Sequence, residues 1–151
     1  MEIKGKERIV APREAVWRGL NDPDILRACI PGCQSLEKSG EDEMAAIVKI
    51  KIGVISATFK GEVRLENKDE PNGYTIIGAG TGGVAGFAKG KADIRLSEEG
   101  GATVLDYVCT ADVGGKIAQL GARLIESTVR RLSGQFFSKF TELASPHMSE
   151  Q

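Results

Sequence analysis

The chain has 151 residues and a mass of 16.1 kDa, which fits one domain of ordinary size. Its hydrophobic share of 41% and charged share of 27% are near the globular average, which excludes a chain that is disordered throughout. The formal net charge is -1, whereas a general nucleic-acid binder is expected to be basic. The sequence contains no apolar run of about 18 residues and no secretory signal pattern in residues 1–30. We therefore expect a cytoplasmic protein with no nucleic-acid partner.

Histidine and cysteine usage argues against several kinds of catalytic centre. The single histidine, His147, lies in the polar segment 145–151, which we expect to form a flexible tail after one domain spanning 1–144. A chain with this one histidine lacks the parts for a Ser-His-Asp or Cys-His nucleophile. Cys29, Cys33 and Cys109 are too few and too scattered for a four-ligand zinc site, and we expect them to be buried and reduced. The sequence predicts no metal site and no enzyme.

The first 35 residues predict one strand and two short helices. Residues 2–10 alternate between apolar and charged side chains, which is the period of a strand. Pro12 suits a first helical turn, and Val16, Trp17 and Leu20 then recur at helical spacing. Asn21-Asp22-Pro23 ends this helix and begins a second short one, which Pro31-Gly32 ends.

From about Leu36 to Val113 the chain predicts about six antiparallel strands. Apolar residues alternate with residues that are almost all polar, so we expect one face of the sheet to be buried and the other to be exposed to solvent. Turn sequences at 71–73, 82–83 and 100–101 separate the strands at a spacing that favours hairpins over helical crossovers.

The remaining apolar stripe predicts one helix of about 28 residues over 116–143, about 42 Å long. A helix of this length has to cross a curved sheet. The fold class predicted is therefore α+β, with a curved antiparallel sheet around a long C-terminal helix and two short helices after the first strand.

Many of the 19 glycines stand inside the predicted strands of residues 73–101. The segment 78–83 formally matches Gly-x-Gly-x-x-Gly, but a strand follows it instead of the helix that dinucleotide binding requires. These glycines are expected to bend the sheet or to leave a cavity under the helix, and the two interpretations are compatible. For the cavity, the small inner-face residues are Gly78, Gly80, Ala88, Gly90 and Ala92.

Four segments resemble the family of the carbon monoxide dehydrogenase G subunit. They are Ile30-Pro31-Gly32-Cys33 followed by Ser35-Leu36-Glu37, then residues 53–61, 86–90 and 115–121, in the family's order. The resemblance covers about residues 2–144. It places the chain in the helix-grip (START/Bet v 1-like) superfamily and implies a seven-stranded sheet around a long C-terminal helix, with a cavity between them.

The resemblance also implies a function. Members are accessory proteins of molybdenum-containing carbon monoxide dehydrogenase and related hydroxylases, and they aid membrane recruitment of the enzyme or electron transfer to quinone. Their implied place is the cytoplasm, with peripheral contact at the inner face of the membrane. Many members have a C-terminal extension for this contact, whereas this sequence ends eight residues after Leu143.

Our first hypothesis is a non-catalytic protein that binds a quinone or similar lipid and has no covalently bound cofactor. Apolar pockets of this kind gain affinity from the area removed from water. Tyr74 and Tyr107 are expected to donate hydrogen bonds to a carbonyl oxygen of the ligand. The residues predicted to form the wall are Ile50, Ile52, Phe59, Val63, Tyr74, Ile76, Gly78, Phe87, Ala88, Leu105, Tyr107, Leu120 and Leu124.

Two alternatives stay open. A ligand-free assembly or recruitment factor for the same enzyme would work through an exposed surface, such as the Pro31-Gly32 turn and the 82–86 loop. A cyclase-type enzyme on the same fold would need an acidic group inside, and Glu7 on the buried face of the first strand, with Tyr107, is the best pair available.

Overall fold

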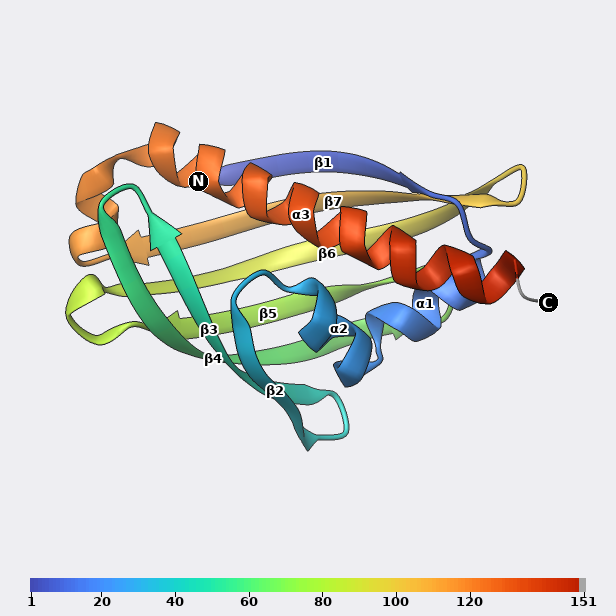
Figure 1. Cartoon of the computed structure of the whole chain (residues 1–151), viewed down its shortest axis with the longest axis horizontal. Helices are drawn as coiled ribbons and strands as arrows, with labels where there is room; N and C mark the ends of the chain where they lie inside the picture. The colour runs from blue at the N-terminus through green and yellow to red at the C-terminus, as the bar shows by residue number, and fades with distance from the viewer. Residues whose placement is uncertain (150–151) are drawn as a thin grey trace.

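The structure, a computed structural model, describes the backbone of residues 1–149 and the side chains of residues 1–144. A single antiparallel sheet carries two short helices and one long helix (Figure 1), and the predicted helix-grip fold is confirmed. The elements are β1 (Glu2–Ile9), α1 (Arg13–Leu20), α2 (Pro23–Cys29), β2 (Cys33–Gly40), β3 (Glu43–Ile52), β4 (Ile55–Asp69), β5 (Gly73–Thr81), the 3-10 helix η1 (Gly83–Ala85), β6 (Phe87–Glu99), β7 (Ala102–Gly114), the 3-10 helix η2 (Lys116–Leu120) and α3 (Ala122–Ser149).

The seven strands are arranged in the order β1-β7-β6-β5-β4-β3-β2. Strands β2 to β7 follow one another through hairpins, and β1 pairs antiparallel with β7. The first two strands therefore form the two edges of the sheet, and α1 with α2 connects them. The hairpin turns alternate between the two ends of the strands, so each end has its own set of loops.

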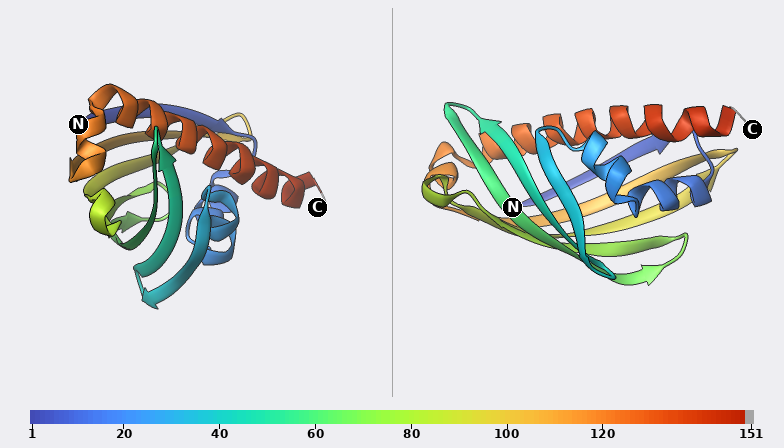
Figure 2. Two further views of the ribbon diagram at one scale, coloured as in Figure 1. Left: turned by 60° about the vertical axis from the view of Figure 1, so that its left-hand side comes forward. Right: turned by 60° about the horizontal axis from the view of Figure 1, so that its bottom comes forward.

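Helix α3 lies across the inner face of the curved sheet, and α1 and α2 lie beside its C-terminal half (Figures 1 and 2). The main core is at this end. Phe140 of α3 is fully buried among Val16 and Trp17 of α1, Ile9 of β1 and Leu105 of β7. The opposite half of α3 contributes Ile125 and Thr128 as its buried residues.

The long helix begins later than predicted. Residues 116–120 form η2, and Gly121, at a φ of 93°, separates it from α3. Apolar residues at 117 and 120 are three apart, a spacing that suits a 3-10 turn as well as an α-helix, which is why the periodicity alone predicted one helix. Helix α3 continues to Ser149, five residues into the predicted tail. Residues 150–151 and the side chains of 145–149 lie outside the described part, so the flexibility of the tail stays a prediction.

The loops at the N-terminal end of α3 meet through two glycines. Gly86 follows η1 at a φ of 121°, and Gly115 precedes η2 at a φ of 81°. A Cβ atom on Gly115 would overlap the Cα of Gly86, so the two backbones approach as closely as glycine allows. This contact joins the β5–β6 loop to the β7–α3 connection.

We predict that Gly115→Ala lowers the free energy of unfolding by about 2–4 kcal/mol, because it adds a backbone overlap to an unfavourable positive φ. The matched control is Gly134→Ala, at a position of α3 where a Cβ meets nothing within 4 Å. This control is expected to raise stability by about 0.5–1 kcal/mol through helix propensity. Urea unfolding of both variants measures the difference, and equal midpoints would contradict the close contact of the two loops.

Candidate functional site

An apolar cavity of about 510 Å³ lies between the inner face of the sheet, the two short helices and α3. Its volume is within the range of about 300–1,000 Å³ that ligand pockets occupy. Leu20, Leu26 and Ile30 border it from the short helices and the residue after them, and Phe136 and Phe137 border it from α3. The strands supply the remaining wall.

Small residues opposite one another leave this space empty. Gly78 of β5 pairs with Gly90 of β6, and Gly80 pairs with Ala88, on the face that the helix covers. On the other side of β5, Gly61 of β4 pairs with Gly80. The interior of a protein is normally filled to crystal-like density, and these pairs provide almost no side-chain volume to fill it. Ala92, predicted with this group, packs against the main core instead.

Eight of the thirteen predicted wall residues border the cavity. They are Ile50, Phe59, Val63, Tyr74, Ile76, Gly78, Ala88 and Leu105. They come from five consecutive strands of the sheet, β3 to β7, and strand alternation turns them to the same face. That any of them contacts a ligand stays a prediction.

The other five predicted residues, Ile52, Phe87, Tyr107, Leu120 and Leu124, do not border this cavity. Phe87 lies on the opposite face from its neighbour Ala88 and is 48% exposed, because successive strand residues point to opposite sides. Tyr107 faces inward but stacks on Phe137, with ring centroids 6.3 Å apart and 19° between planes. Ile52, Leu120 and Leu124 do not border the cavity, since they belong to the loop end of the molecule beyond it.

The sequence prediction missed part of the wall. Leu36, Met44, Ala46 and Val48 border the cavity from β2 and β3. The strand period contained this signal for Met44, Ala46 and Val48, which are in phase with Ile50 on β3. The contribution of α1 and α2 had no such signal, because their apolar stripes are equally typical of a core.

Tyr74 is the one tyrosine at the cavity. Its side chain is 5% exposed, and its ring meets Trp17 edge-on with centroids 5.4 Å apart. Among the residues that the structure describes, its hydroxyl makes no hydrogen bond. Burial raises the pKa of Tyr74 above its ordinary value, so the hydroxyl keeps its proton at neutral pH. It is therefore a free hydrogen-bond donor in an apolar environment.

The pair considered for a cyclase lies away from the cavity. Glu7 does lie on the inner face of β1, opposite Leu105 and partly buried, as predicted. Tyr107 pairs with Gly5 of the same strand β1, and a Cβ on Gly5 would overlap its ring. Neither Glu7 nor Tyr107 borders the cavity.

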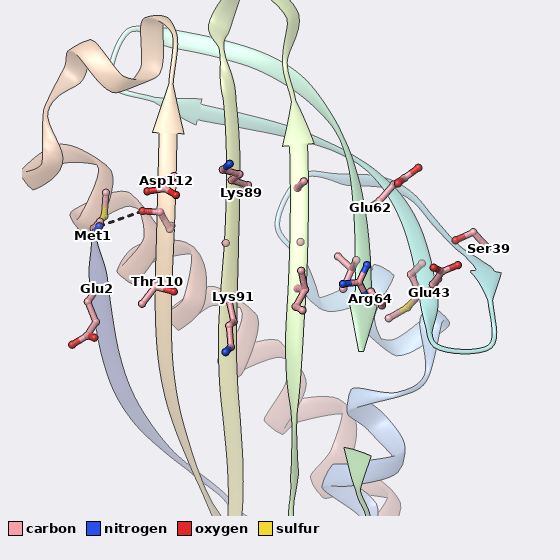
Figure 3. A pocket seen from close by; sticks show the side chains of 17 residues that line it. Met1, Glu2, Ser39, Glu43, Glu62, Arg64, Lys89, Lys91, Thr110 and Asp112 are labelled. Atoms are coloured by element: carbon pink, nitrogen blue, oxygen red, sulfur yellow. Dashed lines mark hydrogen bonds between the residues drawn. The ribbon is translucent and has the colours of Figure 1, made fainter. Parts of the chain in front are cut away.

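A larger hollow of about 800 Å³ lies on the outer face of the sheet (Figure 3). Arg64, Lys89 and Lys91 line it together with Glu62 and Asp112, so both signs of charge are present along it. This lining is that of a hydrated sheet surface and does not fit an apolar ligand. Gly78 and Gly90 border both spaces, so one layer of backbone separates them.

The three cysteines are free thiols. Burial raises the pKa of Cys29, Cys33 and Cys109 above the ordinary thiol value. In the described part of the chain, no group of three or more His, Cys, Asp or Glu residues is arranged to hold a metal ion.

We predict slow alkylation of these thiols by iodoacetamide at a pH of about 7.5. A raised pKa lowers the fraction of reactive thiolate at that pH. The rate is expected to rise towards that of free cysteine when the protein is unfolded in urea, as followed by mass spectrometry. Rapid modification of the folded protein at neutral pH would reveal an activated thiol and contradict the raised pKa of the buried thiols.

Comparison with known proteins gives the family. The family model of the carbon monoxide dehydrogenase G subunit (CoxG) matches residues 5–145. The chain belongs to the CoxG family. No curated protein matches this CoxG-family chain significantly. A solved structure described as a conserved protein from Geobacillus kaustophilus is 31% identical, with a TM-score of 0.92 over 97% of this chain and 96% of that one.

Two more distant structures confirm the fold. The Zhui aromatase/cyclase from Streptomyces sp. R1128 is 15% identical, with a TM-score of 0.67 over 98% of this chain and 95% of that one. Ara h 8.0201 is 13% identical, with a TM-score of 0.69 over 97% of this chain and 98% of that one. At these identities the likeness concerns the helix-grip fold alone. Among the described helices of this CoxG-family chain, none is long and apolar enough to cross a membrane.

Proposed function

We propose that this chain is a non-catalytic accessory protein that binds a neutral apolar ligand, such as a quinone, for a molybdenum-containing carbon monoxide dehydrogenase-type enzyme. Membership of the CoxG family supports the association with that enzyme. The observation that carries the ligand is the apolar cavity of about 510 Å³, with the unpartnered Tyr74 hydroxyl at its wall. Bound to the cytoplasmic protein, the quinone would take electrons from the enzyme or help to bring the enzyme to the membrane.

The charge of the wall favours a neutral ligand over a fatty acid. Glu62 and Lys89 are the charged residues among those that border the cavity, and both lie on strands. Their exposed side chains point to the outer face of the sheet, away from the cavity (Figure 3). With no cationic side chain inside the described cavity wall, a carboxylate ligand would be buried without a partner, which is costly. A carbonyl oxygen needs only one donor, and Tyr74 provides it.

We predict that Tyr74→Phe weakens the binding of a short-chain quinone analogue about 5- to 30-fold, which corresponds to about 1–2 kcal/mol for one buried hydrogen bond. Quenching of the single tryptophan, Trp17, which contacts Tyr74, measures this binding directly. Because phenylalanine keeps the ring contact, the variant should fold normally. Unchanged affinity would exclude Tyr74 as the donor.

We predict that Ala88→Leu abolishes most quinone binding while the protein stays folded, because a larger apolar side chain occupies space that is empty. The matched control is Ala45→Leu on the outer face of β3, where the residue is exposed and does not border the cavity. The control should bind as the wild type does. If Ala88→Leu loses binding but still supports the partner enzyme, the ligand-free assembly role replaces this proposal.

A further inference from the structure

Arg13, the first residue of α1, lies at the end of the sheet where the hairpin turns are acidic. The β4–β5 turn follows Asp69 and contains Glu70, and β6 ends with Glu98 and Glu99 before the β6–β7 turn. A net charge of -1 for the whole chain conceals this local excess of carboxylates. A cationic side chain therefore stands among acidic turns at the point where the first helix begins.

The terminal nitrogens of Arg13 contact two different segments of the sheet. Nη1 donates to Oδ1 of Asn72 in the β4–β5 turn at 2.8 Å, and Nη2 lies 3.4 Å from Oε1 of Glu98 at the end of β6. Glu98 is exposed, so this ion pair contributes little, and the partly buried bond to Asn72 is the stronger attachment. Among the residues that the structure describes, Nε of Arg13 is the one buried side-chain nitrogen or oxygen without a hydrogen-bond partner. An unpaired buried donor is costly, so the contacts of Nη1 and Nη2 have to hold the side chain in place.

The residues of α1 that face the sheet follow β5 in step. Arg13, Trp17 and Leu20 are spaced by four and by three residues, so they lie on one face of the helix. The first of them is bonded to Asn72. The second meets the ring of Tyr74 edge-on, with centroids 5.4 Å apart, and the third borders the cavity. Asn72 and Tyr74 are two residues apart, which is the period of a strand. The helix thus runs beside the strand from the turn to the cavity, with Arg13 at its outer end.

The strand side of this arrangement is rigid. The backbone carbonyl of Asn72 accepts a hydrogen bond from the backbone N–H of Leu96 at 2.8 Å. Between Asn72 and Tyr74, a Cβ on Gly73 would overlap the carbonyl oxygen of Ile94, so the start of β5 lies in close contact with β6. Because the strand is fixed here, the attachment of α1 decides how the two aromatic rings meet.

We propose that Arg13 is a positioning residue for the cavity: by attaching α1 to Asn72, it holds Trp17 against the ring of Tyr74 and keeps the Tyr74 hydroxyl at the cavity wall. The inference deepens the proposed function and rests on it, since this hydroxyl is the donor proposed for the carbonyl oxygen of the ligand. A ring that is already held in place presents its hydroxyl without a further loss of conformational freedom when the ligand binds. Arg13 does not border the cavity, so it acts on the ligand through Tyr74.

The variants Arg13→Ala and Asn72→Ala remove the attachment from its two sides. Each should weaken the binding of a short-chain quinone analogue about threefold to tenfold in isothermal titration calorimetry, which is less than the loss of the whole Tyr74 hydrogen bond. Asn72→Ala keeps the arginine and decides the question if Arg13→Ala does not fold. The matched control is Arg8→Ala, because Arg8 pairs with Glu99 at 3.0 Å at the same end of the sheet but belongs to β1. The control should bind as the wild type does.

The double variant Arg13→Ala/Tyr74→Phe separates positioning from a general loosening of the fold. If Arg13 acts through the hydroxyl of Tyr74, the double variant should bind no more weakly than Tyr74→Phe alone, because the two effects are coupled. Additive losses would overturn the proposal, and so would a loss in Arg8→Ala as large as that in Arg13→Ala.

Trp17, the single tryptophan, gives a readout that needs no ligand. Its side chain is 5% exposed. Arg13→Ala and Asn72→Ala should raise the quenching of its fluorescence by acrylamide about twofold or more, because the ring becomes accessible through local opening, whereas Arg8→Ala should not. Unchanged quenching in the two variants would overturn the positioning role. Raised quenching in a protein that binds no quinone analogue would leave Arg13 as the residue that fixes the two rings and would remove the cavity function.

Discussion

Beneath the middle of α3, the sheet presents glycine and alanine where neighbouring strands usually present bulky side chains. The helix is held at its two ends, by Phe140 against the core of α1 and by Ile125 and Thr128 near its start. Between them, Phe136 and Phe137 border the cavity on one side and pack against the main core on the other. Close packing normally removes such a gap, but the cross-strand pairs Gly78–Gly90 and Gly80–Ala88 cannot fill it. The cavity follows from this shortage of side-chain volume.

The local patterns of the sequence predicted the elements well, but not which residues would share a wall. Strand alternation and hairpin turns were sufficient for the sheet, and most of the residues predicted on β3 to β5 border the cavity. Ile52 has the same strand phase as Ile50, but it lies beyond the end of the cavity. Phe87 was misplaced because its hydrophobicity outweighed the strand phase that Ala88 already fixed. Tyr107 has the correct phase, and only its stacking on Phe137, a contact distant in sequence, removes it from the cavity. The start of α3 was predicted too early, because the positive φ of Gly121 separates η2 from α3 and the periodicity of apolar residues does not reveal a backbone angle.

The strand topology explains why the two ends of this small domain carry side chains of different charge. Because antiparallel hairpins return the chain at every turn, consecutive turns fall alternately at opposite ends of the sheet. Acidic residues in every second turn therefore gather at one end without any long-range arrangement in the sequence, and apolar or basic residues in the intervening turns gather at the other. The main core with Trp17 and Tyr74 lies towards the acidic end, and the thinly packed half of α3 lies at the other. The well-packed core and the acid-free loops thus lie towards opposite ends of the sheet.

The paired glycines allow the volume of the cavity to change by substitution at a few positions. Gly78, Gly80 and Ala88 border the cavity, so a larger side chain at these positions subtracts volume from it. Gly78, for example, has room for a Cβ at ordinary contact distances. A Cβ on Gly90 would instead lie 2.7 Å from the carbonyl oxygen of Thr110 and would force the backbone to shift. Single substitutions at these few positions therefore set the volume of the cavity in this scaffold.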